Sequence, residues 1–285
     1  MAAIPESELI INSNGTVYHL NLLPEHISDT IITVGDPERV AKVSQYFDEM
    51  EIQIAKREFV THTGYYKGKR LTVISTGMGT DNIDILMNEL DALVNIDFQS
   101  REVNEEKIRL NIIRIGTSGS LQQDIPLGSH LASHTSIGLD SLMEFYPLEQ
   151  SEQEQSITAA LQEQLGIGFR PYFVNGSEKL LKQLAFDMVP GNTLTCPGFY
   201  APQGRVLRGG LRNQQLLQTY NGFRHNDFRL TNFEMETAGY YSMGRILGHE
   251  MLSLNAIVAN RITQKFAENA EEVIDSLIRK VLDRI

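Results

Sequence analysis

Residues 112–120 read Ile-Ile-Arg-Ile-Gly-Thr-Ser-Gly-Ser, an apolar run with one arginine that passes into small residues. The pattern predicts a buried strand that ends in a turn of small residues. Glycine allows close backbone approach, and free N–H groups and hydroxyls at such a turn form a concave site for an anion. Arg114 can add a bidentate guanidinium, and the combination suits phosphate. For this stretch alone, a strand with an ordinary turn and a paired arginine is the commoner case.

The same arrangement recurs at two earlier apolar runs. Residues 30–34 are followed by Gly35-Asp36-Pro37, with Arg39 just after, and residues 71–75 are followed by Thr-Gly-Met-Gly79. A helix-like stretch can follow each run. Ligands of open α/β sheets collect outside the carboxyl ends of the strands. Three such turns, two of them with an arginine, therefore predict one anion pocket.

The chain has 285 residues and a formal charge of −11, and its basic residues form no long block. A nucleic-acid backbone requires a basic face, so the composition argues against a nucleic-acid partner. Cys196 is the single cysteine, which rules out an internal disulfide, and no spacing suggests zinc. The N-terminus lacks a signal pattern, and no apolar run approaches the ~18 residues of a membrane span. We expect a cytoplasmic protein with no membrane partner and no bound metal.

Short apolar runs alternate with amphipathic stretches, which predicts a mixed sheet covered by helices on both faces. We expect one α/β domain with a central mixed β-sheet over residues 16–285, after a polar leader at residues 1–15. Strands are expected at residues 30–34, 52–59, 71–74, 108–115, 131–137, 173–175, 193–196 and 252–259. Helices are expected at residues 38–47, 83–94, 156–165, 178–186, 233–246 and 273–285. Irregular structure is expected at residues 63–68, 97–107, 149–155 and 197–205, and the last of these segments is compatible with a mobile lid.

Several motifs together resemble the nucleoside phosphorylase family, most closely its uridine phosphorylases. They are Gly35-Asp-Pro-Glu-Arg-Val40, Ser75-Thr-Gly-Met-Gly79, Arg114-Ile-Gly-Thr-Ser-Gly119, Phe199-Tyr-x-x-Gln-x-Arg205, Glu234-Met-Glu236 and Asn260-Arg261. One such motif alone is weak. All of them in family-like order, over most of the chain from about residue 17 to residue 264, make a specific signal.

The resemblance implies a set of phosphate-binding residues. They are Gly35, Arg39, Arg114 and Thr117, with help from Ser118 and with Arg57 reaching in from a neighbouring subunit. Backbone N–H groups and guanidinium forks suit a tetrahedral oxyanion. The alternative for each arginine is a surface salt bridge, and Glu38 beside Arg39 makes that alternative concrete.

The resemblance also implies a ribose site. Glu236 would accept from the vicinal 2′ and 3′ hydroxyls, Met235 would pack on the sugar, and His19 would come from the partner subunit to the 5′ hydroxyl. Glu234 and Glu236 are two residues apart, so on a helix they would diverge, which argues against a glycosidase with paired carboxylates. The alternative for Glu-Met-Glu is a solvated helix start.

A base site is implied by Phe199, Gln203 and Arg205, which resemble residues that bind uracil. The aromatic ring would stack on the base, the Gln203 amide would match its mixed donor and acceptor edge, and Arg205 would donate to a carbonyl oxygen. The Asn260-Arg261 pair stands about where purine-specific relatives carry an aspartate, and an arginine such as Arg261 is a poor proton donor that suits carbonyl oxygens. The alternative for residues 197–205 is an ordinary Gly/Pro loop.

The implied reaction is reversible phosphorolysis of uridine to uracil and ribose 1-phosphate. It needs no organic cofactor, because phosphate is a co-substrate, and it implies self-association with shared active sites.

Bacterial relatives build a monovalent-cation site from a glutamate and a serine; Glu58 matches the first, but Asn82 replaces the second. A purine phosphorylase, a nucleosidase and a catalytically silent nucleoside-binding protein remain as alternatives. The preference for uridine over deoxyuridine or thymidine, and a dimer against a hexamer, are left open.

Overall fold

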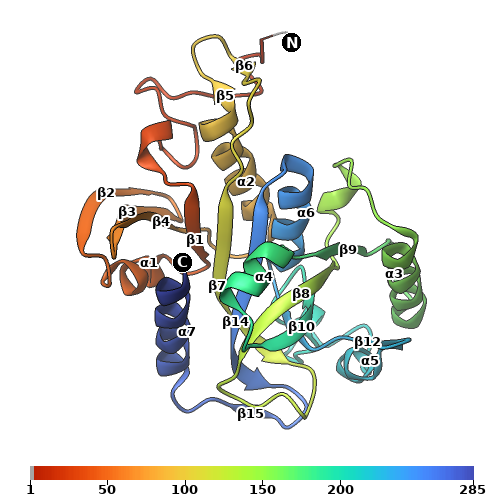
Figure 1. The fold of residues 1–285 in the computed structure, drawn as a ribbon. Helices are drawn as coiled ribbons and strands as arrows, with labels where there is room; N and C mark the ends of the chain where they lie inside the picture. The colour runs from red at the N-terminus through yellow and green to blue at the C-terminus, as the bar shows by residue number, and fades with distance from the viewer. Residues whose placement is uncertain (1–2) are drawn as a thin grey trace. The chain divides into compact units, whose positions relative to one another are not determined.

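The computed structural model describes residues 3–285, and the chain divides into two units (Figure 1). Unit 1 contains the chain up to Ile113 together with Leu247–Glu250, and unit 2 contains Arg114–Ile246 and Met251–Ile285. Strand β7, Asn111–Ser120, passes from the first unit into the second. Both units combine helices with a mixed sheet, so the expected α/β class is confirmed.

The sheet of unit 1 has strands in the order β1-β4-β3-β2. Their bounds are Thr30–Val34 for β1, Glu49–Lys56 for β2, Phe59–Tyr66 for β3 and Lys69–Ser75 for β4. Strands β1 and β4 are parallel, and the other pairs are antiparallel. The two predicted glycine turns therefore lie side by side, and a Cβ atom added to Gly35 would lie 3.4 Å from the Gly77 carbonyl oxygen.

Two helices follow the parallel strands of unit 1, as predicted. Helix α1, Pro37–Ser44, begins after Asp36, whose side chain accepts from the Glu38 N–H. Helix α2, Thr80–Asn95, follows β4 and buries Ile83, Leu86, Met87, Leu90 and Leu93. The short 3-10 helix η1, Pro24–His26, precedes β1.

The expected turn at residues 63–68 is wrong for residues 63–66, which belong to strand β3. Gly64 has a packing role in that strand, because a Cβ atom there would lie 2.2 Å from the Glu49 carbonyl oxygen on β2. The excursion at residues 97–107 contains a small hairpin of β5, Ile96–Asp97, and β6, Glu102–Val103. Arg101 in its turn donates to the carbonyl oxygens of Ile4, Pro5 and Leu9. These bonds hold part of the expected leader against unit 1.

The sheet of unit 2 has strands in the order β15-β14-β8-β10-β13-β7, and β9 pairs with β8. Strand β7 also pairs with β14, so strands β14, β8, β10, β13 and β7 form a closed circuit. Strands β8, β10 and β13 are parallel, whereas β14 and β9 pair antiparallel with β8, and β7 pairs antiparallel with β13. The bounds are His130–Gly138 for β8, Tyr172–Asn175 for β9, Val189–Thr195 for β10, Asn232–Glu234 for β13, Glu250–Asn260 for β14 and Lys265–Phe266 for β15.

The predicted turn at residues 116–120 is wrong, because these residues complete strand β7. Ser120 and Gly119 pair with Asn232 and Phe233 of β13. Their backbone groups are therefore part of a sheet ladder and do not form an open anion-binding turn. Gly119 lets the Phe233 ring approach closely, since a Cβ atom there would lie 3.2 Å from the ring.

Five helices and a small hairpin complete unit 2 within the described residues. The helices are α3 at Glu152–Leu165, α4 at Glu178–Leu184, α5 at Leu216–Gly222, α6 at Thr237–Leu247 and α7 at Ala270–Arg284. The 3-10 helices are η2 at Leu142–Glu144 and η3 at Ala201–Gln203, and the hairpin strands are β11 at Arg224–His225 and β12 at Phe228–Arg229. The expected loop at residues 149–155 is wrong from Glu152 onward, because Ser151 and Glu154 form a capping box that starts α3. Helix α5 was not expected, whereas the amphipathic α7 is confirmed.

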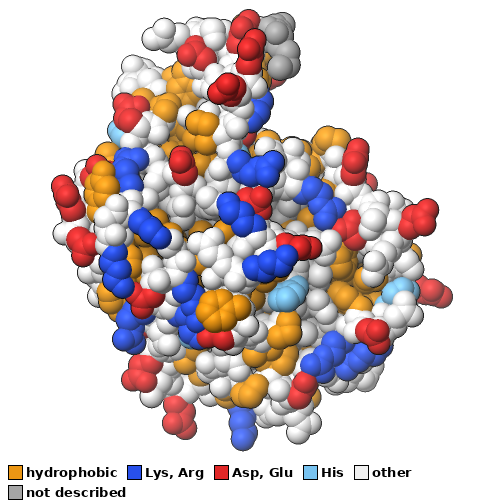
Figure 2. All heavy atoms as spheres, in the orientation of Figure 1, with side chains coloured by type: hydrophobic (Ala, Val, Ile, Leu, Met, Phe, Trp, Pro, Cys, Tyr) orange, Lys and Arg blue, Asp and Glu red, His pale blue; other side chains and the backbone are white. Residues whose placement is uncertain are grey.

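Acidic and basic side chains are interspersed over the face of the molecule that Figure 2 shows. In residues 3–285, no helix is both long and apolar enough to cross a membrane. The same residues contain no group of three or more His, Cys, Asp or Glu side chains placed to hold a metal ion. Cys196 is buried.

Candidate active site

Arg114 lies on strand β7, and its guanidinium is buried against two carboxylates. Its Nη2 atom lies 2.7 Å from Glu236 Oε2 and 3.1 Å from Glu234 Oε2. Its Nη1 atom donates to Asn255 Oδ1 at 3.0 Å and to Ser253 Oγ at 3.3 Å. The residue is 5% exposed, so both ends of the guanidinium are fixed by buried partners.

These contacts correct our expectation for Glu234 and Glu236. The two side chains were expected to diverge on one helix, but Glu234 ends strand β13 and helix α6 begins only at Thr237. Both carboxylates therefore reach the same nitrogen of Arg114. A solvated helix start is also wrong, because both glutamates are buried. Met235, between them, is only partly buried.

Glu234 has a role that sequence reasoning did not assign. Its Oε2 atom accepts from the backbone N–H groups of Glu236 and Thr237, at 2.8 and 2.9 Å. Its Oε1 atom accepts from Thr195 Oγ1 at 2.6 Å. A carboxylate at a helix N-terminus satisfies free N–H groups and the helix dipole. Glu234 thus ties the start of α6, and with it Glu236, to Arg114.

The charge of Arg114 is stable in this environment. Burial alone would lower its pKa, but the attraction of Glu234 and then Glu236, with the hydrogen bond to Glu236, raises the pKa above its ordinary value. A buried charge persists only when it is paired and hydrogen-bonded.

Ser118 and Thr117, both predicted to lie near phosphate, follow Arg114 on the same strand. The side chains of Arg114 and Ser118 share one face of β7, because alternate residues of a strand face the same side. Ser118 is buried, and its Oγ atom accepts from Asn232 Nδ2 at 3.1 Å. Thr117 is partly exposed.

A second group of predicted residues surrounds Gln203 of η3, near the end of β13. Arg205 Nη1 donates to Gln203 Oε1 and to the Phe199 carbonyl oxygen, both at 2.6 Å. Arg261 Nη1 donates to the Gln203 carbonyl oxygen at 3.0 Å. Both guanidinium groups lie within 6 Å of the Phe233 ring, at 5.9 Å for Arg205 and 5.7 Å for Arg261. The structure therefore brings together all four residues that were predicted to hold the base.

This second group is rich in positive charge. Within residues 3–285, neither Arg205 nor Arg261 forms an ion pair with a carboxylate. Burial, and then repulsion by Arg261, lowers the pKa of Arg205 to about 10, and burial lowers the pKa of Arg261. Arg205 remains protonated at neutral pH. A partly buried pair of arginines without a counter-ion attracts ligand oxygens that carry negative charge.

Phe199 departs in one respect from the role that we expected. Its ring is 49% exposed, and the Arg205 guanidinium lies over it at 3.7 Å from the ring centroid. The Tyr200 ring meets it edge to face at 5.3 Å. One ring face is therefore covered by a cation–π contact, so a base could stack only on the other face.

His19 in unit 1 is held by Glu89 of helix α2. The Glu89 carboxylate lies 2.6 Å from His19 Nδ1 and accepts from the backbone N–H groups of His19 and Leu20. A carboxylate only accepts, so Nδ1 carries a proton, and Nε2 of the neutral ring is an acceptor. Such an acceptor fits the predicted contact with a hydroxyl group.

Arg57 lies at the tip of the β2–β3 hairpin, where its backbone has a positive φ of 56°. Its guanidinium lies 5.9 Å from the centroid of the Tyr18 ring, and the Tyr18 and His19 rings meet edge to face at 4.7 Å. Arg57 and His19, the two residues predicted to serve a neighbouring subunit, thus adjoin the same tyrosine. Arg57 is exposed, and His19 is partly exposed.

Gly35 and Arg39 stand at the start of α1 in unit 1, as the sequence predicts. The Arg39 N–H donates to the Asp36 carbonyl oxygen at 3.0 Å. Both residues are partly exposed. Their role toward phosphate stays a prediction.

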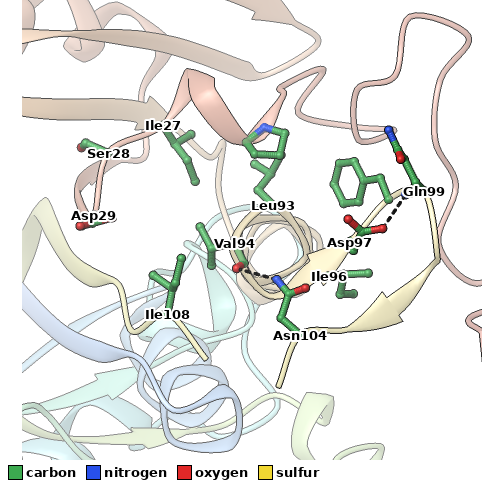
Figure 3. Close-up of a pocket in the computed structure, with 12 residues that line it drawn as sticks. Ile27, Ser28, Asp29, Leu93, Val94, Ile96, Asp97, Gln99, Asn104 and Ile108 are labelled. Atoms are coloured by element: carbon green, nitrogen blue, oxygen red, sulfur yellow. Dashed lines mark hydrogen bonds between the residues drawn. The ribbon is translucent and has the colours of Figure 1, made fainter. Parts of the chain in front are cut away.

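A pocket of about 580 Å³ lies elsewhere in unit 1 (Figure 3). Its lining mixes apolar side chains, such as Ile27, Leu93 and Ile108, with polar ones that include the carboxylates of Asp29 and Asp97. Neither a lysine nor an arginine lines it, and it contains none of the predicted site residues. It therefore offers no cationic side chain to a phosphate.

Unit 2 of this α/β fold therefore contains two distinctive groups of residues: a buried arginine held by two carboxylates, and two arginines without carboxylate partners. Comparison with known families identifies the class of protein. The model of the phosphorylase superfamily matches residues 29–283, and the chain belongs to this superfamily. The match includes most of both units, so they are parts of one family domain.

Individual relatives agree with this assignment. The chain is 29% identical to the uridine phosphorylase of Thermococcus kodakarensis, over 90% of this chain and 82% of the relative. It is 26% identical to a DeoD-type purine nucleoside phosphorylase of Alkaliphilus metalliredigens, over 93% of this chain and 97% of the relative. The crystal structure of a Trypanosoma brucei nucleoside phosphorylase with uridine phosphorylase activity is similar at a TM-score of 0.86 and 28% identity, and the match covers 97% of this chain and 100% of that one.

Proposed function

We propose that the protein is a uridine phosphorylase, a pentosyltransferase that converts uridine and phosphate reversibly into uracil and ribose 1-phosphate. The group of Gln203, Arg205 and Arg261 carries the proposal. Uracil leaves as an anion whose charge lies largely on its ring carbonyl oxygens, and fixed cations aimed at that charge stabilise the transition state. Two arginines without carboxylate partners suit this leaving group.

The orientation of the Gln203 amide also supports uracil as the base. Its oxygen accepts from Arg205 at 2.6 Å, which leaves the NH₂ group as the donor of the amide. The residue is 3% exposed, so this donor is aimed from a fixed, buried position. A donor beside two guanidinium groups matches a base edge with carbonyl oxygens.

Purine nucleosides are the second candidate substrates, because purine phosphorylases are also among the relatives. A purine leaving group is helped by an acid that protonates or hydrogen-bonds its ring nitrogen. In the described part of the chain, no aspartate or glutamate forms an ion pair with Arg205 or Arg261. The charge of this group therefore favours the pyrimidine.

Arg114 and Glu236 supply the other half of the proposed reaction. Glu236 would accept from the ribose hydroxyls, and Arg114 would attract phosphate while it holds Glu236 at 2.7 Å. As the bond between C1′ and the base breaks, the ribosyl ring becomes positively charged, and phosphate attacks it. The enzyme acts by positioning and by charge stabilisation, without a nucleophilic side chain or an organic cofactor.

We also propose that the active site is shared between subunits. Arg57 and His19 both adjoin Tyr18 at an exposed part of unit 1, so one interface could carry both residues to a neighbour. His19 would accept from the 5′ hydroxyl through Nε2, in the orientation that Glu89 imposes.

The base assignment is tested by turnover of uridine and inosine, each with phosphate, on the same preparation. We expect uracil release with uridine and little or no hypoxanthine release with inosine. Faster turnover of inosine would contradict the pyrimidine assignment and leave the family assignment intact. Binding of uridine without turnover of either nucleoside would support a silent nucleoside-binding protein instead.

A further inference from the structure

A continuous series of hydrogen bonds joins Arg114 to Ser118 through the buried polar side chains of unit 2. Its members come from strands β7, β14, β8, β10 and β13, which form the closed circuit of the sheet. In order, the side chains are those of Arg114, Asn255, Ser133, Thr193, Asn232 and Ser118. All six residues are buried, and the most exposed are Arg114 and Ser118 at 5%. We call this series the polar chain.

The distances within the polar chain are those of ordinary hydrogen bonds. Arg114 Nη1 lies 3.0 Å from Asn255 Oδ1, and Asn255 Nδ2 lies 3.2 Å from Ser133 Oγ. The hydroxyls of Ser133 and Thr193 are 2.6 Å apart, and Thr193 Oγ1 lies 3.0 Å from Asn232 Oδ1. The last bond, from Asn232 Nδ2 to Ser118 Oγ, is 3.1 Å.

Arg114 sets the direction of the first two bonds in the polar chain, and the Asn232 amide oxygen, which accepts from Thr193, sets the direction of the others. A guanidinium only donates, so Asn255 presents its amide oxygen to Arg114 and its NH₂ group to Ser133. Thr193 uses its single proton on Asn232 Oδ1, so the proton of Ser133 lies between Ser133 and Thr193. Asn232 then presents its NH₂ group to Ser118.

The Ser118 hydroxyl is the end point of this ordering. Its oxygen accepts from Asn232, so its proton is directed away from the polar chain. In residues 3–285, no side chain or backbone oxygen accepts that proton. A buried hydroxyl prepared to donate, on the same face of β7 as Arg114, is suited to an anion.

We infer that Asn232 is a positioning residue for phosphate: it holds Ser118 as a hydrogen-bond donor to the phosphate bound beside Arg114. The inference rests on the proposed function, because it assumes a phosphate at this face of β7. Hydrogen bonds in series polarise one another, so the charge of Arg114 strengthens the donor at the far end. Burial of six polar side chains is costly unless each is hydrogen-bonded, and within residues 3–285 the Ser118 proton is left without an acceptor.

The direct test is Asn232→Asp, which keeps the shape of the side chain but replaces its NH₂ group with an acceptor. The Ser118 proton would then turn toward the new carboxylate and away from phosphate. We expect KM for phosphate to rise about 10- to 100-fold, because phosphate loses one hydrogen bond to a charged group. KM for uridine should change less than about twofold. The control is Asn192→Asp on β10, because Asn192 also lies in the sheet, donates to the Arg229 carbonyl oxygen and stands outside the polar chain.

A double-mutant cycle shows whether Asn232 acts through Ser118. With Ser118→Ala as the second change, the effect of Asn232→Asp on KM for phosphate should disappear, and Ser118→Thr, which keeps the hydroxyl, should retain it. If Asn232→Asp raises KM for phosphate by the same factor in the wild-type protein and in Ser118→Ala, the inference is wrong. If Asn232→Asp does not fold, Asn232→Ala takes its place in the same cycle with the same expected result.

Stabilisation by inorganic phosphate separates this inference from the proposed function. We expect phosphate to raise the melting temperature of the wild-type protein, and to raise that of Asn232→Asp much less. A full phosphate response in Asn232→Asp would overturn the inference alone. If the wild-type protein neither responds to phosphate nor uses it in turnover, the proposed function fails, and the inference fails with it.

Discussion

The guanidinium of Arg114 occupies the space that a side chain at Gly116 would need. A Cβ atom added to Gly116 would lie 2.2 Å from Arg114 Nη1 and 2.5 Å from its Cζ atom. Arg114 and Gly116 face the same side of β7, so the arginine side chain extends along its own strand toward Ser120 and covers Gly116. Because two carboxylates and Asn255 fix the guanidinium, it cannot move aside without the loss of buried bonds.

Gly116→Ala should therefore reduce activity sharply without any change to a residue that binds substrate. We expect kcat/KM for phosphate to fall about 100-fold or more, the cost of displacing a buried charge from its partners. Steady-state kinetics in the phosphorolysis assay measures the effect. The control is Gly168→Ala, because a Cβ atom there meets nothing within 4 Å. Equal activity of the two variants would contradict the tight fit of Arg114 over Gly116.

Gln203→Glu should impair uridine turnover more than phosphate binding. The new carboxylate would still accept from Arg205, now as an ion pair, but it would lose the amide donor and place a negative charge beside the departing uracil anion. We expect kcat/KM for uridine to fall about 100-fold while phosphate still raises the melting temperature. Gln214→Glu is the control, because Gln214 is exposed in a nearby segment. A loss of phosphate binding in Gln203→Glu would argue against its assignment to the base.

Glu154 should contribute stability that depends on pH. Its carboxylate accepts from Arg245, Asn175 and the Ser151 N–H. Burial would raise the pKa of Glu154, but the bonds from Arg245 and Ser151 lower it below the ordinary value. A lowered folded-state pKa means that the stability is present above the unfolded pKa of about 4.3 and is lost as the pH falls through the folded value.

We expect Glu154→Gln to lower the free energy of unfolding by about 2–3 kcal/mol at pH 7, with a smaller difference below about pH 4. Urea denaturation at both pH values measures it. Glu163→Gln, an exposed site on the same helix, should change stability little at either pH. If the loss in free energy of unfolding caused by Glu154→Gln is the same at both pH values, the charge of Glu154 is not the source of the stability.

Subunit mixing tests the proposed sharing of His19 and Arg57. A protein with His19→Ala and Arg57→Ala, and a second with Arg114→Ala, should each be nearly inactive. If one subunit supplies His19 and Arg57 to the Arg114 of its neighbour, then co-expression should restore about a quarter of wild-type activity, since random pairing gives one intact site in half of the dimers. Activity of the mixture no greater than the sum of the separate proteins would contradict shared sites.

Sequence reasoning was most successful where a local apolar pattern determines the element. Strand β1 has its predicted bounds at Thr30–Val34, and α7 buries the predicted stripe of Ile274, Leu277, Ile278, Val281 and Leu282. It failed at residues 116–120, because small residues favour turns and the pairing with β13 joins residues more than a hundred positions apart. The start of α3 was missed although its signal, Ser151 with Glu154 three residues later, was present.

In the candidate site, too, contacts between residues close in sequence could be predicted, whereas contacts between distant residues could not. Gln203 and Arg205 were expected to act together, and their proximity in the chain makes their contact easy to foresee. The convergence of Glu234 and Glu236 on Arg114 depends on a strand that ends between them and on a partner 120 or more residues earlier. No local pattern marks Asn255 or Glu89 as the residues that orient Arg114 and His19, because only the folded chain brings them into contact.

The most direct test of the central claim is the fate of phosphate during uridine cleavage, followed by phosphorus NMR together with the ultraviolet absorbance of uracil. Our account predicts one ribose 1-phosphate for each uracil released, and no release when phosphate is absent. It also predicts that added uracil and ribose 1-phosphate re-form uridine. Release of uracil with free ribose, at a rate independent of phosphate, would show that water is the acceptor and would contradict the assignment as a phosphorylase.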